Sequence, residues 1–232
     1  MKKTQLIVKK VAAKFGMYFS KQPAKYDLLK EEIKKNLLAE SGGVLHVGAH
    51  YGQEAKLYSA LGLGVIWIEA DEKPFLVLQK TIKKYANQSA IQALVGDRDE
   101  KSVLFYEANN NTSSSLFEFG QDMPVESLKM VKTKKLNMVR IDKMFTENEL
   151  KPYLYWCLDV QGAELLALKG AGTLISVPKV IEVEVSTREE YRGGALYSEL
   201  HEYLTTFNFF PLWKPKSDSH ENVLYVSKNH WT

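Results

Sequence analysis

From residue 43 onward, short apolar runs alternate with segments whose apolar positions recur at helical spacing. The strand-like runs are VLHVGA (44–49), VIWIEA (65–70) and AIQALVGD (90–97), and the helix-like segments between them are EAKLYSALG (54–62) and PFLVLQKTIKKYA (74–86). β-rich runs separated by helices of this length predict parallel strands joined by right-handed crossovers. The pattern therefore predicts an α/β, doubly wound sheet.

The same alternation returns in the second half of the chain. YLYWCLDV (153–160), GAELLALKGAG (162–172) and KVIEVEVS (179–186) predict strand, helix and strand, and a final helix is predicted over 195–207. Two further strand-like runs within 208–228 are separated by a polar connection that contains proline. This arrangement predicts a C-terminal antiparallel hairpin.

The middle of the chain is less regular. Residues 102–130 contain a strand-like run followed by a polar Asn/Ser tract, which predicts a loop over the open edge of the sheet. The run LNMVRIDKMF after it predicts another short strand and a turn into a helix. No repeat or second domain boundary is visible from residue 41 onward.

Composition and charge separate a basic arm from the domain. The chain has 232 residues, 45% hydrophobic and 25% charged, which suits one main domain, predicted over 41–232. Residues 1–35 carry ten Lys against three acids, although the net charge of the whole chain is only +3. The predicted helical arm, residues 1–40, could contact an anionic membrane surface, or it could be a helix that caps the domain or a partly disordered segment. No nucleic-acid-reading motif accompanies it, so no nucleic-acid partner is expected.

Cysteine usage and hydropathy bear on the compartment. Cys157 is the only cysteine, which excludes an intramolecular disulfide and a multi-cysteine zinc site. No window approaches the roughly 18 apolar residues of a membrane span. We therefore expect a cytoplasmic protein, with peripheral membrane contact through the arm left open.

Two glycines follow the first predicted strand. Gly48 stands at the strand end and Gly52 lies four residues later. In a doubly wound sheet, ligands bind beyond the carboxyl ends of the strands, and a glycine there admits close approach of a ligand to the backbone. We expect Gly52 to open a helix whose free N–H groups attract negative charge. The stretch thus predicts a cofactor-binding loop.

The spacing of neighbouring polar residues distinguishes between cofactors. The stretch lacks the G-x-G-x-x-G of nicotinamide and flavin proteins and the G-x-x-x-x-G-K-[ST] of nucleotide triphosphate sites. Glu69, at the end of the second strand, could accept both hydroxyls of a ribose, and Asp97, at the end of the third, could accept from an adenine amine. Together these features indicate an S-adenosylmethionine (SAM) site, with His50 of the glycine loop as a further cofactor contact.

Six blocks then follow one another along the chain: HVGAHYGQE, WIEADEKPF, NTSSSLFEF, LDVQGAELLALKGAG, IEVEVS and YSELHEYLTTFNFFPL. In this order they resemble the FkbM-type SAM-dependent methyltransferases, over about 43–212. The resemblance implies a class I methyltransferase (Rossmann-like) three-layer sandwich with a mostly parallel seven-stranded sheet. It also implies methyl transfer, most often to a hydroxyl of a sugar or natural product, and it places Ser114 and Ser115 beside the cofactor. Two positions depart from the family, which usually has Asp where His46 stands and Glu where Gln161 stands.

Transfer to a hydroxyl requires a base or a metal near the acceptor oxygen. Asp159 ends the strand YLYWCLD, and Glu184 lies near the carboxyl end of VIEVEV. We expect Asp159 and Glu184 to flank the acceptor, one of them as general base, with Glu164 orienting them or helping to hold a divalent ion. No cluster of His ligands supports such a metal. Glu182, on the same strand, is expected to be salt-bridged or exposed.

Two other functions stay open at this stage. A binding or scaffold protein could retain the fold without catalysis, and His46 and Gln161 are compatible with that alternative. A nicotinamide oxidoreductase is disfavoured by the missing third glycine. The expected partner is a small-molecule or glycan acceptor of unspecified identity, and the sequence does not determine the oligomeric state.

Overall fold

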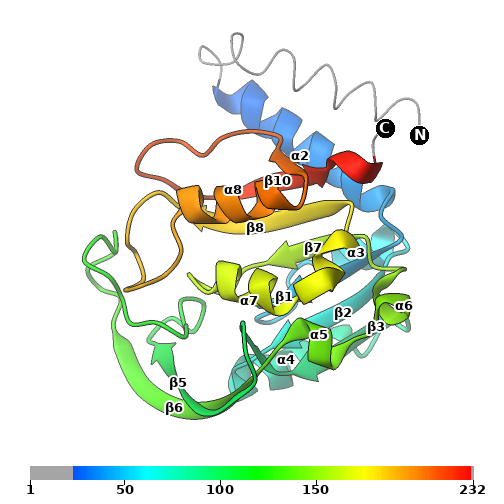
Figure 1. The fold of residues 1–232 in the computed structure, drawn as a ribbon. Coiled ribbons are helices and arrows are strands. Elements are labelled where there is room, and N and C mark those ends of the chain that lie inside the picture. The colour runs from blue at the N-terminus through cyan, green and yellow to red at the C-terminus, as the bar shows by residue number, and fades with distance from the viewer. Residues whose placement is uncertain (1–22, 231–232) are drawn as a thin grey trace.

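The computed structural model describes the backbone of residues 23–230 and the side chains of residues 27–230, and its centre is a seven-stranded sheet (Figure 1). The strands of this sheet are β1 (Gly43–Val47), β2 (Gly64–Glu69), β3 (Gln88–Gln92), β7 (Tyr155–Leu158), β8 (Val180–Ser186), β9 (Phe209–Pro211) and β10 (His220–Ser227). Their order across the sheet is β3-β2-β1-β7-β8-β10-β9. β10 runs antiparallel to both β8 and β9, while the pairs from β3 to β8 are parallel. The predicted mostly parallel sheet with a C-terminal antiparallel hairpin is confirmed.

Helices cover both faces of the sheet (Figure 1). They are α2 (Pro23–Ala39), α3 (Ala55–Ala60), α4 (Glu72–Ile82), α5 (Ile141–Met144), α6 (Glu147–Leu150), α7 (Glu164–Gly170) and α8 (Tyr197–Thr206), with 3-10 helices η1 (Gly172–Ser176) and η2 (Lys228–His230). The chain first steps outward from β1 to β3, then returns to β7 beside β1 and proceeds the other way. Right-handed crossovers therefore place α3 and α4 on one face and α7 on the other. The connections after β1 and β7 diverge, which opens a crevice at the carboxyl ends of these strands.

The central strands are buried on both faces. Every residue of β1 and β7 is buried, which explains why both read as nearly continuous apolar runs. The largest fully buried side chains include Trp67, Trp156, Tyr58, Tyr155 and Phe209. Burying a large apolar side chain contributes about 1.5–3 kcal/mol, so the centre of the sheet carries most of the hydrophobic stabilisation.

Helix α2 packs into this same core. Its Ile33, Leu37 and Leu38 are at most 2% exposed and belong to the main hydrophobic cluster. The sequence analysis assigned residues 1–40 to a separate basic arm, whereas the packing joins the described part of that arm to the domain. The expected helical face and membrane contact of residues 1–22 lie outside the described residues.

Ion pairs fix α2 to the sheet. Lys34 Nζ donates to Glu182 Oε1 at 2.6 Å, and the Tyr155 hydroxyl donates to Glu182 Oε2 at 2.7 Å. Glu182 is 2% exposed, so of the two predicted alternatives it is the salt-bridged one. Lys30 makes a second ion pair, to Glu221 at 2.7 Å. A basic helix is held here because the buried carboxylate of Glu182 on β8 needs a partner, and the partly exposed Glu221 on β10 adds a second ion pair.

A second sheet lies beside the first and was not predicted as such. It contains β4 (Leu94–Val95), β5 (Glu100–Ala108) and β6 (Met130–Val139), in the order β4-β6-β5. The run AIQALVGD was predicted as one strand, but β3 ends at Gln92 and the following residues pair with β6 in the other sheet. Asp97 therefore does not end a strand of the main sheet.

Lysines obscured β6 in the sequence. The strand contains four charged or polar exposed residues and alternates only weakly, because much of this ribbon faces solvent. Lys134 points inward and forms ion pairs with Asp71, at 2.8 Å, and with Glu107. Among residues 23–230, no helix combines the length and apolar character needed to cross a bilayer.

Candidate functional site

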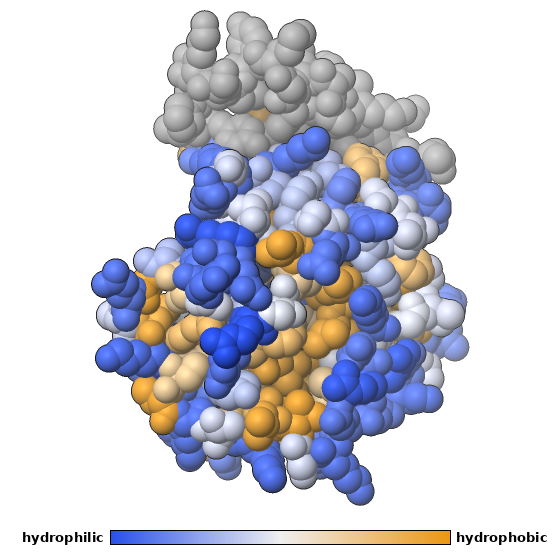
Figure 2. All heavy atoms as spheres, turned by 60° about the vertical axis from the view of Figure 1, so that its left-hand side comes forward, coloured by the Kyte–Doolittle hydropathy of each residue, from blue (hydrophilic) through white to orange (hydrophobic). Residues whose placement is uncertain are grey.

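A cavity of about 490 Å³ lies at the carboxyl ends of β1, β2, β7 and β8. Its walls come from the loop after β1, the ends of β2, β7 and β8, the ribbon of β5, the segment 111–128, and the start of β10. Figure 2 looks onto this edge of the molecule and shows apolar side chains in the middle of the face, between hydrophilic borders. The cavity occupies the topological switch point, where ligand sites of open α/β sheets lie.

Gly48 lines the cavity for a reason that differs from the predicted one. Its φ is +85°, and a Cβ added there would lie 1.7 Å from the carbonyl oxygen of Asp159. The missing side chain thus lets the loop after β1 pass the end of β7. The close approach expected for a ligand is made by the protein's own backbone.

Gly52 does not occupy the position predicted for it. It is absent from the cavity wall, and a Cβ there would meet Leu78 Cδ1 of α4 at 2.7 Å. Helix α3 begins at Ala55 and has only six residues, so Gly52 does not open it. The prediction that Gly52 contacts the cofactor is therefore corrected to a packing role against α4.

Glu69 ends β2 inside the cavity and organises the neighbouring loops. Its Oε2 accepts from the backbone N–H of His50 at 2.7 Å, and its Oε1 accepts from that of Asp71 at 2.8 Å. Burial raises the pKa of Glu69, while these two backbone donors act in the opposite direction. A carboxylate has about four acceptor sites, so each oxygen retains capacity for a hydroxyl donor. The geometry is compatible with the predicted ribose contact.

His50 also lines the cavity, in a left-handed conformation with φ of 45°. Its Nδ1 lies 3.0 Å from Gln53 Nε2, and its buried Nε2 has no hydrogen-bond partner among the residues that the structure describes. Burial lowers the pKa of His50, which favours the neutral ring. An unpartnered ring nitrogen on a cavity wall can hydrogen-bond a ligand.

Asp97, Ser114 and Ser115 were predicted to contact the cofactor, but they lie in different positions relative to the cavity. Asp97 lies outside the cavity wall and pairs with Arg98 at 3.0 Å, because its strand belongs to the second sheet. Ser114 lines the cavity, and its hydroxyl accepts from the N–H of Ala108 at 3.1 Å. Ser115 is buried outside the wall and donates to the carbonyl of Gln161 at 2.6 Å. Ser115 therefore anchors a loop, and only Ser114 of these three faces the cavity.

An apolar wall beside Glu69 was missed from the sequence. It is formed by Ala93, Leu94, Val95, Phe105 and Leu116. Phe105 belongs to the ribbon, and sequence patterns do not reveal that the ribbon folds back over the cavity. The wall suits a flat apolar heterocycle next to a ribose-binding carboxylate.

His46 and Glu54 line another part of the cavity. His46 is buried, stacks on Trp67 with ring centroids 4.8 Å apart, and lies 3.2 Å from the Tyr58 hydroxyl. Burial, with the nearby charge of Lys34, lowers the pKa of His46 to about 3, so the ring is neutral. Glu54 is thus the acid of this region, and burial raises its pKa.

The predicted catalytic carboxylates meet at the opposite end of the cavity. Gln161 joins them, because its Nε2 donates to Asp159 Oδ1 and to Glu184 Oε2, both at 2.6 Å. Its Oε1 accepts from the Tyr191 hydroxyl at 2.5 Å. Burial, then the charge of Asp159, raises the pKa of Glu184 to about 7, and burial also raises that of Asp159. Gln161 has a φ of 56°, a strained conformation of the kind that gathers at functional sites.

Glu164 lies behind this pair. It is 3% exposed and absent from the wall of the main cavity. Its Oε1 accepts from the N–H groups of Val160 at 2.8 Å and Gly162 at 3.2 Å. Burial, then the charge of Glu184, raises the pKa of Glu164 to about 7. Glu164 therefore shapes the turn that presents Gln161, which matches the orienting half of its predicted role.

The three carboxylates also raise the question of a metal. Asp159, Glu164 and Glu184 each offer one oxygen, and these oxygens lie within 4.8 Å of one another. Such a group can bind a divalent cation. Glu164 is already held by two backbone amides, however, and the other two carboxylates by Gln161 and His220. We treat the cluster as hydrogen-bonded carboxylates and assign no metal to it.

His220 and Glu190 complete this end of the cavity and were missed from the sequence. The sequence analysis placed His220 in the connection of the hairpin, but β10 begins there. Antiparallel pairing sets His220 opposite Ser186, at the end of β8. Glu190 is 3% exposed, in a loop whose conformation the sequence pattern does not predict. The positions of His220 and Glu190 depend on strand pairing and on the conformation of a loop, and no sequence motif predicts either of them.

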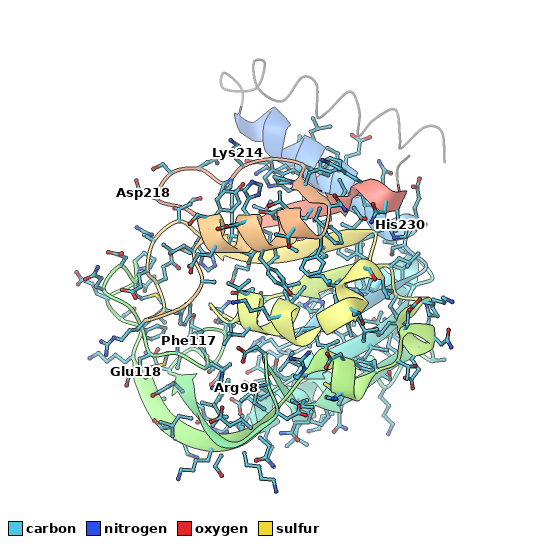
Figure 3. The ribbon with its side chains drawn as sticks, in the orientation of Figure 1. Arg98, Phe117, Glu118, Lys214, Asp218 and His230 are labelled. Carbon is cyan, nitrogen blue, oxygen red and sulfur yellow. The ribbon has the colours of Figure 1, made fainter. Side chains whose placement is uncertain are left out.

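Two segments, which we call the roof loops (109–128 and 187–196), cover the carboxylates together. The N–H of Gly120 donates to the carbonyl of Glu190 at 2.7 Å, and that of Arg192 to the carbonyl of Glu118 at 2.8 Å. Phe119 also bridges to Tyr191. Figure 3 shows Phe117 and Glu118 of the first roof loop on the same side of the molecule as Lys214 and Asp218 near the start of β10. The two roof loops therefore contact each other beside the acidic end of the cavity.

Comparisons with known proteins found a matching family model and several similar solved structures. The family model described as "Methyltransferase FkbM domain" matches residues 46–211. Among solved structures, the chain is similar to a SAM-dependent methyltransferase from Aquifex aeolicus, with 12% identity, coverage of 84% of this chain and 87% of that chain, and a TM-score of 0.45. It is also similar to the magnesium protoporphyrin IX methyltransferase of Synechocystis PCC 6803 with bound SAH, with 11% identity, coverage of 97% and 83%, and a TM-score of 0.45. No curated protein matches the chain.

The family assignment rests on the family model and the topology. The matched segment covers more than half of the chain and contains the residues of the cavity from His46 to Tyr191. The strand order, with an antiparallel β10 between β8 and β9, is that of class I SAM-dependent methyltransferases. This match favours a methyltransferase over the nicotinamide oxidoreductase considered above. The chain belongs to the FkbM family of SAM-dependent methyltransferases.

Proposed function

We propose that this protein transfers a methyl group from SAM to a hydroxyl of a sugar, a glycan or another small hydroxylated metabolite. One observation supports this most strongly: a single cavity joins the cofactor-type wall around Glu69 to the hydrogen-bonded pair of Asp159 and Glu184. The first region suits a nucleoside and the second suits proton removal. Their continuity gives an acceptor hydroxyl access to the donor.

The residues present fit SAM. Glu69 would hold the ribose hydroxyls, and the apolar wall that includes Leu94 and Phe105 would hold the adenine. Glu54 would hold the ammonium of the methionine part, because His46 is neutral in the structure. When bound, SAM supplies a sulfonium methyl group that an oxygen nucleophile can displace. The protein contributes binding, alignment and exclusion of water.

Proton removal is assigned to Glu184, with Asp159 beside it. The pKa of Glu184 is raised to about 7 by burial and by the charge of Asp159. A base of this pKa is ionised in part at neutral pH and accepts a proton more readily than an exposed carboxylate. Gln161 donates to both acids and so keeps the two carboxylates together without adding charge.

The wall around these acids indicates the acceptor's charge. At this end of the cavity wall, three acids, Asp159, Glu184 and Glu190, face His220, which is already paired with two of them. Arg188, outside the wall, is paired with Glu190. A phosphate or carboxylate next to the reacting hydroxyl would be repelled. A neutral polyol such as a sugar suits this wall better.

The test measures S-adenosylhomocysteine formed from SAM with a panel of neutral sugars, glycans and hydroxylated metabolites. With an accepted acceptor, Asp159→Asn and Glu184→Gln should each lower kcat by about 10²-fold or more, the effect typical of a lost general base. Glu202→Gln, an equal change on an exposed acid of α8, is the control. Near-normal rates in both site variants would remove the assignment of these acids.

A cofactor-binding protein without catalysis is the second candidate. One observation favours it, namely that His46 places a neutral ring where this family usually has a carboxylate. That function predicts that SAM binds but that no acceptor in the panel is methylated. Turnover of any acceptor above the rate of the Glu184→Gln variant would exclude it.

A further inference from the structure

His220 lies between two carboxylates that come from different parts of the chain. Its Nε2 is 2.6 Å from Glu184 Oε1 on β8, and its Nδ1 is 2.8 Å from Glu190 Oε2 in the second roof loop. Carboxylates are acceptors, so both ring nitrogens can donate at once only when the ring is the imidazolium. The ring therefore makes two charge-assisted hydrogen bonds and joins the two acids.

The backbone around His220 holds the ring in place. His220 pairs with Ser186 in the antiparallel ladder between β10 and β8, so its strand position is fixed relative to Glu184. Glu190 is held from its other side by Arg188 Nε, which donates to Oε1 at 3.2 Å. A fixed strand residue thus connects a catalytic carboxylate to a loop that covers it.

We propose that His220 is a positioning residue for the reaction: it aims Glu184 at the acceptor hydroxyl and fastens the second roof loop over the acceptor end of the cavity. This inference rests on the proposed methyl transfer. The proton of the acceptor hydroxyl passes to a Glu184 oxygen and is later released to water. His220 keeps both of its ring protons throughout: Nδ1–H stays bonded to the Glu190 carboxylate, and Nε2–H stays bonded to Glu184 Oε1, which remains an acceptor when the transferred proton is on the other Glu184 oxygen.

The charges around His220 support this role. The bond to Glu184, followed by the charges of Glu184 and Glu190, raises the pKa of His220 to about 9. In return, the imidazolium counteracts the burial that raises the pKa of Glu184. The titratable and charged groups that face this pair from the neighbouring elements are Asp159, Glu164, Arg188, Glu190 and Tyr191. Removing the imidazolium leaves Glu184 among acids, so its proton would be lost only at higher pH.

The first experiment compares pH–rate profiles of the wild type, His220→Gln and His201→Gln. His201, on α8 outside the cavity wall, provides the matched control. For His220→Gln we expect kcat to fall by about 10-fold or more, with the KM for SAM changed less than about twofold, because Glu184 loses its orientation and not the cofactor. The acid limb of the kcat/KM profile should move to higher pH by about one unit, because the loss of a neighbouring positive charge raises the pKa of a carboxylate by about that amount. A profile that superimposes on the wild type would overturn the proposal.

The second experiment does not require turnover and separates this proposal from the proposed function. Amide hydrogen exchange is measured over residues 187–196 in the wild type, His220→Gln, Glu190→Gln and His201→Gln. Both His220→Gln and Glu190→Gln should accelerate exchange in this roof loop by about tenfold or more, while His201→Gln leaves it unchanged. If the wild type methylates nothing, the proposed function fails, but this loop result still decides whether His220 fastens the loop. Unchanged exchange in His220→Gln would contradict that role.

Discussion

Gly48 shows how a single residue sets the shape of the site. Its absent side chain allows the loop after β1 to touch the carbonyl of Asp159, and that contact fixes how far apart the ends of β1 and β7 lie. Asp159 belongs to the acid pair, so the same contact positions the acceptor end of the cavity. The glycine therefore shapes the site through the protein's backbone, and it also lines the cavity in which its cofactor contact is predicted.

Gly48→Ala should lower the free energy of unfolding by about 4 kcal/mol or more, because its Cβ would overlap backbone that cannot move aside. Urea denaturation measures this loss. Gly62→Ala is the matched control, since Gly62 also has a positive φ, of 72°, but a Cβ there meets nothing within 4 Å. The control should lose only about 1–2 kcal/mol, the cost of the left-handed backbone. Equal losses in the two variants would contradict the contact with Asp159.

Residues at the ends of parallel strands could be predicted from the sequence. Glu69, Asp159 and Glu184 follow or end recognisable apolar runs, and parallel strands bring such ends to one edge. His220 could not be found in this way, because it starts an antiparallel strand after a polar connection and its apolar run begins only at Val223. Asp97 was misplaced because a one-residue break after Gln92 moves the chain into another sheet.

At the scale of elements, α2 shows a limit of charge patterns. Its many lysines indicated a separate arm. Lys34, however, forms an ion pair with Glu182, a carboxylate buried in the sheet. Among its described side chains, the buried apolar residues are only Ile33, Leu37 and Leu38, while Leu28 is 71% exposed. The ribbon of β5 and β6 shows a related limit: the strand-like run of β5 and the end of β6 were predicted, but the lysines on the exposed face hid the first part of β6. The centre of the main sheet was predictable because β1 and β7 are buried along their whole length and consist almost entirely of apolar residues.

Lys34→Ala should destabilise the fold by about 2–4 kcal/mol, because it removes the cation paired with the buried Glu182 and leaves the hydrogen bond from the Tyr155 hydroxyl. This figure lies somewhat below that of a fully buried pair, since the Lys34 side chain is 25% exposed. Thermal or urea unfolding measures it. Lys35→Ala, at an exposed position one residue along the same helix, should change stability by less than about 0.5 kcal/mol. A loss in Lys34→Ala no larger than in Lys35→Ala would show that the helix does not depend on this ion pair.

At the scale of the whole molecule, the buried acids and His220 link stability to pH. The folded pKa of Glu164 and of Glu184 is raised to about 7, so each contributes stability below its ordinary pKa of 4.5 that is lost as pH rises through 7. The folded pKa of His220 is raised from 6.5 to about 9, so its contribution is present below 6.5 and is lost as pH rises through 9. Both effects have the same sign.

The free energy of unfolding should therefore fall between pH 6.5 and 9. The double variant His220→Gln/Glu184→Gln replaces the ion pair by neutral amides and should show a flatter profile over this range. Urea denaturation at half-unit steps of pH compares the two proteins. If the free energy of unfolding of the double variant falls with pH as steeply as that of the wild type, other groups in the molecule cause the pH dependence.

The central claim is that the ends of β1 and β2 bind SAM so that its methyl group faces the acid pair. Calorimetric titration with S-adenosylhomocysteine tests it most directly, using the wild type, Glu69→Gln and, as control, Asp97→Asn outside the cavity. We predict one site in the wild type, affinity lowered about tenfold or more in Glu69→Gln through lost charged hydrogen bonds, and no change in Asp97→Asn. Absence of binding to the wild type, or equal affinity in Glu69→Gln, would contradict the account.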